Sequence, residues 1–307
     1  MVCIGNKIIK LAKYYDVIQS SEYDQIHNLK LRKKIGNKLV IYHGPYFDKF
    51  NKGYNLKCKL FDKIFLNKKY KKVRFITKSE LATIFLKEKG FENVTTVGVG
   101  IDKDKFNNNI DEKKLLNILK KDEKYLLYIG KLEKRRNILL LIKLLKELNR
   151  NNEKIKLVLV GNGKKEYVEE VFNYAKKINI NDKIIYIKEI SQNEIRMLYD
   201  KCDIFLLPTE YEIFGMVLLE AMYFKIPVIT TVNGGSSVLI ENNKNGIICN
   251  INNMEEWKEK TEKLLSNTQL KEKIVEQAYN KVSQYYTWEN LANKFLEIYE
   301  SKDNRME

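Results

Sequence analysis

Residues 208–222 read PTEYEIFGMVLLEAM. They follow Asp203–Leu207, an apolar run that is typical of a buried strand, and a helix is expected from Met216 to Tyr223. Gly215 stands before this helix and, because it has no Cβ, lets a ligand approach the backbone closely. The N–H groups that are left free at a helix start suit a phosphate. The segment is therefore a candidate anion site.

Two of the glutamates in the same segment are candidate ligands. Glu212 precedes the predicted helix, and Glu220, eight residues later, lies about one turn inside it. Their oxygens can accept hydrogen bonds from the hydroxyl groups of a sugar. A glutamate in the first turns of a helix is also favoured by the helix dipole without any ligand. On the residues alone, both interpretations stand.

Strands and helices alternate around this segment, which favours an α/β fold with a parallel sheet. Such sheets bind ligands in a crevice beyond the carboxyl ends of their strands. The predicted strands of this half are 125–129, 156–160, 183–187, 203–207 and 227–230, and its predicted helices reach 149 and about 178 and span 193–201 and 216–223. The first half predicts a helix at 4–14, strands at 16–19, 38–42, 73–77 and 94–97, and a helix that opens at Ser79. A polar, mostly helical segment at 106–121 is the predicted domain boundary.

Two further loops follow predicted strands of the second half. Gly130–Asn137, GKLEKRRN, puts Lys131 and Arg136 at a strand end, where a diphosphate would need cations. Asn233–Ser237, NGGSS, supplies small residues at another strand end. Each loop alone is typical of a turn. Together, at successive strand ends of one sheet, they predict a ligand site.

These motifs resemble family 4 of the glycosyltransferases. Four segments carry the resemblance, which extends from Asp16 to about Tyr299: Gly130–Asn137 is similar to G-R-L-x-x-x-K-x, Val160–Gly163 to V-G-x-G, Glu212–Met222 to the E-x7-E signature, and Pro227–Gly235 to P-V-I-A-T…G-G. The resemblance implies the GT-B fold, with two Rossmann-like domains facing a cleft. The implied domains are a partial acceptor-side domain at 1–110, a donor-binding domain at 111–285, and a C-terminal helix at 286–307 that packs back toward the first domain.

The resemblance also assigns roles to single residues. Glu212 would contact the transferred sugar, Glu220 would hold the ribose hydroxyls, and His43, in an H-G turn, would lie near the reacting sugar. The alternative for His43 is a strand-end residue with structural hydrogen bonds, but the Gly44-Pro45 context and the family match favour the functional role. The donor diphosphate and nucleotide would contact the remaining loop residues, namely Gly130, Lys131, Arg136, Gly161, Gly163, Phe214, Gly215 and Met216.

The implied reaction is transfer from a UDP- or GDP-linked sugar with retention and without a covalent enzyme intermediate. It belongs to the hexosyltransferase class (EC 2.4), with a glycan, lipid-linked or small-molecule acceptor in cell-surface polysaccharide biosynthesis. No cofactor or metal is expected. Asp102-Lys-Asp104 resembles a metal motif but lies in a turn that the family shares, and with only His27 and His43 no histidine-based metal site is expected.

The sequence departs from the family pattern at several points. Ile213 replaces a usual glycine, and Lys188 lies where a glycine is common, so the base and the sugar stay open. Family members begin with a strand, a glycine-rich loop and further βα units before the position of Met1, so the acceptor domain is expected to be incomplete. The alternative function is therefore a catalytically inactive donor-binding remnant.

The charge is concentrated in the first third of the chain. Residues 1–105 contain 23 Lys and Arg against 10 Asp and Glu, and so carry +13 of the net +16. This excess could attract nucleic acid, anionic lipid or an anionic acceptor, and it is equally explained by a solvated basic surface. Nucleic acid is not expected, because no recognition motif accompanies the charge. No signal peptide, membrane span or metal-type cysteine spacing is visible, which predicts a cytoplasmic protein with free thiols, or a peripheral one at the inner membrane face.

Overall fold

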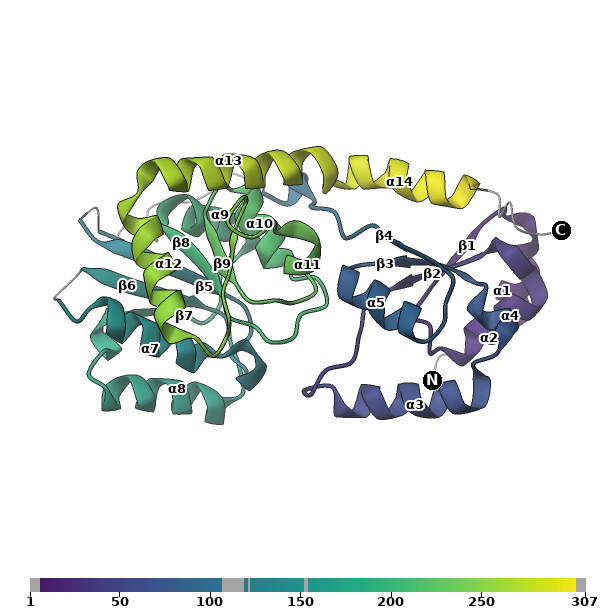
Figure 1. Cartoon of the computed structure of the whole chain (residues 1–307), viewed down its shortest axis with the longest axis horizontal. Coiled ribbons are helices and arrows are strands. Elements are labelled where there is room, and N and C mark those ends of the chain that lie inside the picture. Colours follow the sequence, from purple (N-terminus) through teal and green to yellow (C-terminus); the bar gives the residue numbers. More distant parts are fainter. Residues whose placement is uncertain (1–5, 107–118, 121, 152–153, 302–307) are drawn as a thin grey trace. The chain divides into compact units, whose positions relative to one another are not determined.

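The computed structural model describes residues 6–106, 119–120, 122–151 and 154–301. The chain forms two compact units. The first comprises residues 1–99 and 288–307, and the second comprises residues 100–287. Each unit is built on one parallel sheet with helices on both faces (Figure 1). The helix and domain boundary predicted at 106–121 fall almost entirely on residues 107–118, outside the described residues.

The sheet of the first unit has the order β1-β2-β3-β4, and all neighbours are parallel. Its first strand starts two residues later than predicted, because Ile18 pairs with Leu39 at the start of the ladder. The strands are β1 (Ile18–Ser21), β2 (Leu39–His43), β3 (Arg74–Thr77) and β4 (Asn93–Thr96). The helices are α1 (Asn6–Leu11), α2 (Ile26–Ile35), α3 (Lys52–Phe65), α4 (Lys68–Lys71), α5 (Glu80–Glu88) and α14 (Trp288–Glu300).

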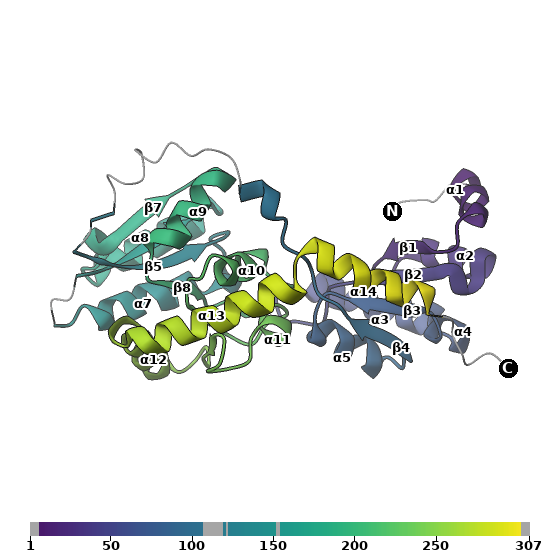
Figure 2. The same cartoon turned by 90° about the horizontal axis from the view of Figure 1, so that it is seen from above.

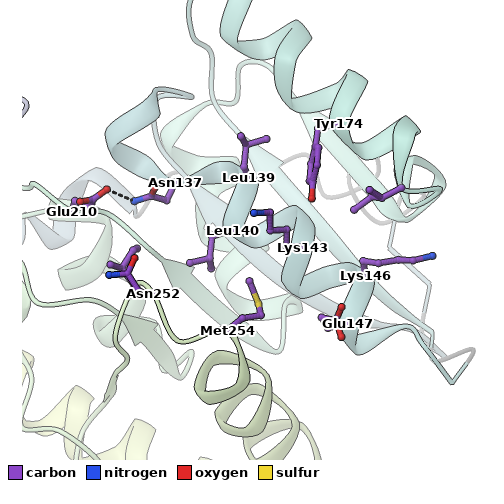
Figure 3. Close-up of a pocket in the computed structure, with 12 residues that line it drawn as sticks. Asn137, Leu139, Leu140, Lys143, Lys146, Glu147, Tyr174, Glu210, Asn252 and Met254 are labelled. Atoms are coloured by element: carbon purple, nitrogen blue, oxygen red, sulfur yellow. Dashed lines mark hydrogen bonds between the residues drawn. The ribbon is translucent and has the colours of Figure 1, made fainter.

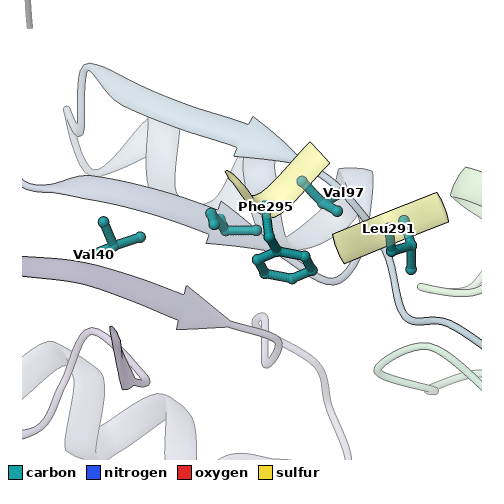
Figure 4. Packing of buried hydrophobic residues seen from close by; sticks show 5 residues of the cluster. Val40, Val97, Leu291 and Phe295 are labelled. Carbon is teal, nitrogen blue, oxygen red and sulfur yellow. The ribbon is translucent and has the colours of Figure 1, made fainter. Parts of the chain in front are cut away.

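Consecutive residues of a strand point to opposite faces, so this sheet has two apolar layers. On one face the ring of Tyr23 packs edge-on against Phe61 of α3 and Phe85 of α5, with centroid distances of 5.6 Å in both cases. The other face is covered by α14. There, Leu291 and Phe295 pack with strand residues such as Val40 (Figure 4). A helix from the far end of the chain thus completes the core of the first unit.

Arg74 binds the C-terminal end of α14 through hydrogen bonds. Its Nη1 donates to the carbonyl oxygens of Ile298 (2.8 Å) and Ser301 (3.1 Å), and its Nη2 donates to that of Asn37 (3.1 Å). A cation suits this place because the last carbonyls of a helix lack intrahelical partners and carry its negative partial charge.

The sheet of the second unit has the order β10-β9-β8-β5-β6-β7, again all parallel. If the six strands are numbered 1 to 6 from β5 to β10 and the sheet is read from β7 to β10, the order is 3-2-1-4-5-6, the doubly wound arrangement. The strand order reverses between β5 and β8. Loops that leave these two strands therefore diverge to opposite faces and open a crevice. The strands are β5 (Lys124–Ile129), β6 (Ile155–Val160), β7 (Ile184–Ile187), β8 (Ile204–Leu207), β9 (Val228–Thr230) and β10 (Ile247–Ile248).

Helices cover both faces of this sheet (Figure 2). One face carries α7 (Ile138–Leu148), α8 (Lys165–Lys177) and α12 (Met254–Ser266). The other carries α9 (Gln192–Lys201), α10 (Met216–Tyr223) and α13 (Thr268–Tyr285), while the short α11 (Ser236–Leu239) follows β9. Among the described residues, no helix has the length and apolar character needed to span a bilayer.

Candidate functional site

The loops that follow β5 and β8 are tied together at the point where the strand order reverses. The Glu210 N–H donates to the Arg135 carbonyl oxygen (3.0 Å). The Asn137 side-chain amide donates to the Pro208 carbonyl oxygen (3.1 Å) and to a Glu210 carboxylate oxygen (3.2 Å). These bonds fix the two loops that contain most of the predicted donor residues.

Arg136 and Glu212 meet across these loops. Arg136 Nη1 forms an ion pair with Glu212 Oε2, and the two side chains are only 11% and 15% exposed. The Arg136 Nε is buried and has no hydrogen-bond partner among the described residues. The structure therefore joins the cation predicted for the diphosphate to the carboxylate predicted for the sugar, and it leaves part of the guanidinium unused.

The start of α10 lies directly beside this pair. Gly215 has φ +77°, a conformation that favours glycine, and a Cβ there would lie 3.0 Å from Glu212 Cγ. The first bond of the helix runs from the Leu218 N–H to the Gly215 carbonyl oxygen (2.9 Å). The N–H groups of Met216 and Val217 precede it and have no intrahelical acceptor. The start of α10 therefore offers N–H groups that have no intrahelical acceptor, with Glu212 packed beside Gly215, and anion binding there stays a prediction.

Glu220 lies deeper, on the buried side of α10. Its carboxylate accepts a hydrogen bond from the Tyr199 hydroxyl (3.1 Å), and the residue is 8% exposed. Burial raises the pKa of Glu220 to about 7, against the lowering effects of the Tyr199 hydrogen bond and of the Lys105 charge. Burial and the Glu220 charge in turn raise the pKa of Tyr199. Sequence reasoning missed Tyr199, since 21 residues separate it from Glu220.

The predicted glycines of the loops after β5 and β6 have a packing role. A Cβ on Gly161 would lie 2.1 Å from the Gly130 carbonyl oxygen, and one on Gly163 would lie 2.1 Å from the Leu132 carbonyl oxygen. The Leu132 N–H also donates to the Asn162 carbonyl oxygen (2.8 Å). These glycines let two loop backbones touch, which explains them without a ligand. Their donor-binding role stays a prediction.

The loop after β9 contacts the backbone carbonyl groups of Glu212 and Phe214. The Gly234 N–H donates to the Glu212 carbonyl oxygen (2.9 Å), and a Cβ on Gly235 would lie 1.8 Å from the Phe214 carbonyl oxygen. The loop itself is held by the buried Asn233, whose side-chain oxygen accepts from the N–H groups of Gly235 (3.0 Å) and Ser236 (3.1 Å). The small residues in this motif therefore position the Glu212–Phe214 backbone.

Two surface grooves border these loops. One, of about 740 Å³, contains Lys131 and Gly163 together with Lys134 and Lys164. The other, of about 800 Å³, runs along α7 (Figure 3). It includes the Asn137–Glu210 hydrogen bond but none of the predicted donor residues. Of the two, the groove beside Lys131 is the one that contains predicted donor residues.

In the first unit, His43 is paired with a carboxylate. His43 ends β2 and is fully buried, and its Nδ1 lies 2.7 Å from Glu22 Oε2. Burial raises the pKa of Glu22, but the hydrogen bond and charge of His43 outweigh this effect, and the net pKa is lowered. Glu22 adopts φ +54°, which is uncommon for a residue with a side chain. His43 Nε2 has no hydrogen-bond partner within the described part of the chain.

Sequence reasoning did not find Glu22. The register of β1 and β2 explains why Glu22 meets His43. Ser21, the last residue of β1, pairs with Tyr42 of β2, and Glu22 and His43 are the residues that follow these two. The carboxylate fixes the imidazole through Nδ1 and leaves Nε2 as the free ring nitrogen. This arrangement is suited to a positioned proton donor or acceptor.

Asp102 directly precedes a short 3-10 helix, Lys103–Phe106, which includes Asp104. The Asp104 N–H donates to an Asp102 carboxylate oxygen (3.3 Å), and Lys105 lies 3.7 Å from the other Asp102 oxygen. Within the described ranges, no three His, Cys, Asp or Glu side chains gather as they would around a metal ion. Independence from metal stays a prediction.

A family model described as Glycosyl transferases group 1 matches residues 109–281. An uncharacterized glycosyltransferase of Methanocaldococcus jannaschii is 28% identical over 229 residues, which cover 72% of this chain and 57% of that protein. The capsular polysaccharide biosynthesis glycosyltransferase CapM of Staphylococcus aureus is 31% identical over 215 residues, covering 66% and 55%. The chain spans about half the length of such curated relatives.

Solved structures agree with the fold. Anabaena HepE in complex with UDP superposes with a TM-score of 0.78 at 18% identity, covering 95% of this chain and 80% of that one. A glycosyltransferase of Rickettsia africae gives a TM-score of 0.75 at 22% identity, covering 96% and 79%. At these identities the likeness shows the fold alone: two Rossmann-like domains of the GT-B class, as expected from the sequence.

Proposed function

We propose, because this chain belongs to the glycosyl transferases group 1 family, that it transfers a sugar from a nucleoside diphosphate sugar to an acceptor hydroxyl. The observation that carries the proposal is the meeting of Arg136, Glu212 and the α10 start at the point where the strand order reverses. A cation with an unused N–H and a helix N-terminus suit a diphosphate, and a carboxylate beside them suits a sugar hydroxyl.

In the proposed reaction the bond between the sugar C1 and the diphosphate oxygen breaks, and its electron pair stays on the phosphate. The acceptor oxygen bonds to C1 on the same face and gives its proton to the departing phosphate oxygen, so the anomeric configuration is retained. Arg136, Lys131 and the N–H groups of Met216 and Val217 would stabilise the departing charge, and no metal or covalent intermediate is needed. Such preorganised donors contribute about 10²–10³ in rate each.

Glu220 would hold the ribose of the donor. A ribose diol offers two hydroxyl donors, and the Glu220 carboxylate already accepts one hydroxyl, that of Tyr199. The base is uracil or guanine by our proposal. For the acceptor, we propose a glycan or lipid-linked intermediate of cell-surface polysaccharide synthesis, which the name of the S. aureus relative supports. The place of action would be the cytoplasm, at the inner membrane face, in line with the basic first third of the chain.

Calorimetric titration of the full chain with UDP, GDP and ADP tests the donor site. We expect one nucleotide to bind, with the affinity lowered at least tenfold in Lys131→Ala and Glu220→Ala. Lys164→Ala is the matched control, since Lys164 lines the same groove as Lys131 but has no predicted donor role. Absence of binding by folded protein would overturn the proposal.

Release of nucleotide from UDP- and GDP-linked sugars tests the chemical step. We expect turnover with the sugar nucleotide whose base binds. Binding of that nucleotide without transfer or hydrolysis in the presence of candidate acceptors would instead identify a donor-binding protein, the alternative function.

A further inference from the structure

Helix α3 has a second apolar face that points away from its own unit. Leu56, Leu60 and Ile64 are 60%, 53% and 67% exposed. Their spacing of four residues places them in one stripe along the helix. The opposite side of α3 is buried in the core through Cys58 and Phe61. Burial of the first unit's own core therefore does not explain the stripe, which we call the α3 stripe (Leu56, Leu60 and Ile64).

Cations accompany the α3 stripe on one side. At 100° per residue, Lys52, Lys59 and Lys63 fall in a row next to it, and all three are exposed. None of them pairs with a carboxylate of the described residues. The acidic residue of this helix, Asp62, is turned to the other side, where it pairs with Lys89 and accepts from the Tyr23 hydroxyl (3.1 Å). The outward face of α3 is thus apolar and cationic, without an acid.

A basic groove begins where the α3 stripe ends. It has a volume of about 790 Å³ and lies between α2 and the segment that joins α3 to α4. Ile64 forms part of its wall. Other wall residues are Leu29, Arg32, Lys33, Phe65 and Lys69. An apolar stripe that leads into a cationic groove suits anionic amphiphiles, which combine a negative headgroup with an apolar tail.

We propose that the α3 stripe and this groove dock the protein on an anionic lipid bilayer. The three apolar side chains would enter the boundary between headgroups and acyl chains, while Arg32, Lys33 and Lys69 would contact lipid phosphates. The inference rests on the proposed function, because it names the surface that would bring the donor site to a membrane acceptor. Helices with such a face lie in the plane of the bilayer interface.

Charge decides between a bilayer and other occupants. In a dimer formed through this face, the lysine rows of two copies would approach each other, and like charges at an interface are unfavourable. A nucleic acid would match the lysines but not the leucines. An anionic bilayer matches both, since it offers negative headgroups above an apolar layer.

Co-sedimentation with vesicles tests the charge component. We expect binding to phosphatidylcholine vesicles that contain phosphatidylglycerol, and little binding to phosphatidylcholine alone. Lys59→Glu/Lys63→Glu should lower the affinity by at least roughly 25-fold, because each lysine removed accounts for about fivefold and each new carboxylate adds repulsion. Lys176→Glu/Lys177→Glu on α8 makes the same change in net charge at two exposed positions of the other unit, and should lower it less than threefold.

A second pair of variants tests the apolar component. Leu56→Gln/Leu60→Gln should lower the affinity about tenfold for each leucine. Ile84→Gln/Leu296→Gln, at two other exposed apolar positions of the first unit, should leave it unchanged. In addition, Leu60→Trp should give a blue-shifted fluorescence emission when the anionic vesicles are added.

Three outcomes would overturn the docking surface. They are failure of the wild-type chain to bind anionic vesicles at low salt, equal losses in the α3 variants and their controls, and a dimer in sedimentation equilibrium that Leu56→Gln/Leu60→Gln dissociates. Nucleotide titration of the same variants separates this test from the proposed function. If the wild-type chain binds nucleotide but not vesicles, the docking surface alone is overturned. If the wild-type chain does not bind nucleotide, the proposed transferase function is overturned.

Discussion

Arg136 and Glu212 form a largely buried ion pair that bridges the loops after β5 and β8. The pair balances two charges which would each be costly to bury alone. In the proposed reaction, the incoming diphosphate competes with Glu212 for the guanidinium, and the released carboxylate becomes free to accept a hydrogen bond from the sugar. The ion pair would thus couple the arrival of the leaving group to the placement of the sugar.

Substitution of either partner should therefore have different effects on binding. Arg136→Gln should lower the affinity for nucleotide about 10- to 100-fold, since a charged hydrogen bond to phosphate is lost. Glu212→Gln removes the competitor, so the free nucleotide should bind as tightly as before or more tightly, while transfer falls by about 10²–10³. Calorimetry and turnover measure the two effects. Equal loss of nucleotide affinity in both variants would contradict the competition.

Glu220 should make donor binding depend on pH. The ribose hydroxyls need an ionised acceptor, and burial raises the pKa of this carboxyl to about 7. The affinity for nucleotide should hence fall as the pH is lowered from 8 to 6, by about tenfold per unit once below the pKa. Glu220→Gln should bind weakly and show a flat profile over this range. A wild-type profile that is equally flat would exclude the ribose role.

The same carboxyl should also make stability depend on pH, with the opposite sense. Its pKa is raised from 4.5 to about 7 in the folded state, so between these values the folded chain holds more protons than the unfolded chain. Unfolding free energy should then decline by up to about 3 kcal/mol as the pH rises through this window. Glu220→Gln should abolish this decline. Urea unfolding at pH 5 and pH 8 gives the comparison, and a stability difference that the variant retains would assign the effect to other groups.

Glu22 should matter for turnover rather than for donor affinity. Its carboxylate holds the Nδ1 side of His43, so Glu22→Gln should loosen the orientation of the imidazole. We expect turnover to fall about 10- to 100-fold, with a shifted pH–rate profile and unchanged nucleotide affinity. Glu80→Gln, at an exposed position of α5, is the control. An unchanged profile with reduced melting temperature would indicate a purely structural pair.

Two glycine substitutions should have opposite signs. Gly235→Ala puts a methyl group against the Phe214 carbonyl, so the loop must move, and we expect a loss of about 1–3 kcal/mol together with weaker nucleotide binding. Gly53→Ala, in α3, meets no atom within 4 Å and should stabilise the chain by up to about 1 kcal/mol. Thermal unfolding and calorimetry measure both. Tolerance of Gly235→Ala would show that the loop is not fixed as described.

The second unit was the more predictable from sequence. Its strands from β5 to β9 begin within one residue of the predicted positions, and α10 has the predicted bounds. Short apolar runs bounded by glycine and polar residues signal such strands well, because both faces of a parallel sheet are buried. The grouping of loops at strand ends also followed from the alternation of strands and helices alone.

Other features were not found from the sequence. Helix α3 was not predicted, although its apolar side chains follow a helical period. The Glu22–His43 and Tyr199–Glu220 pairs join residues that are 21 positions apart in both cases. Arg136 and Glu212 were each singled out, but their pairing depends on how two loops fold across a sheet.

Completion of the first core by α14 has a consequence for biosynthesis. Leu291 and Phe295 reach the ribosome exit about 190 residues after β4, so at roughly 5–20 residues per second the newly made sheet waits about 10–40 s for its cover. During this interval Val40, Ile76 and Val97 face solvent as a flat apolar surface. The nascent chain is then a natural client for chaperones, and a chain that lacks α14 would keep this apolar face of the sheet exposed to solvent.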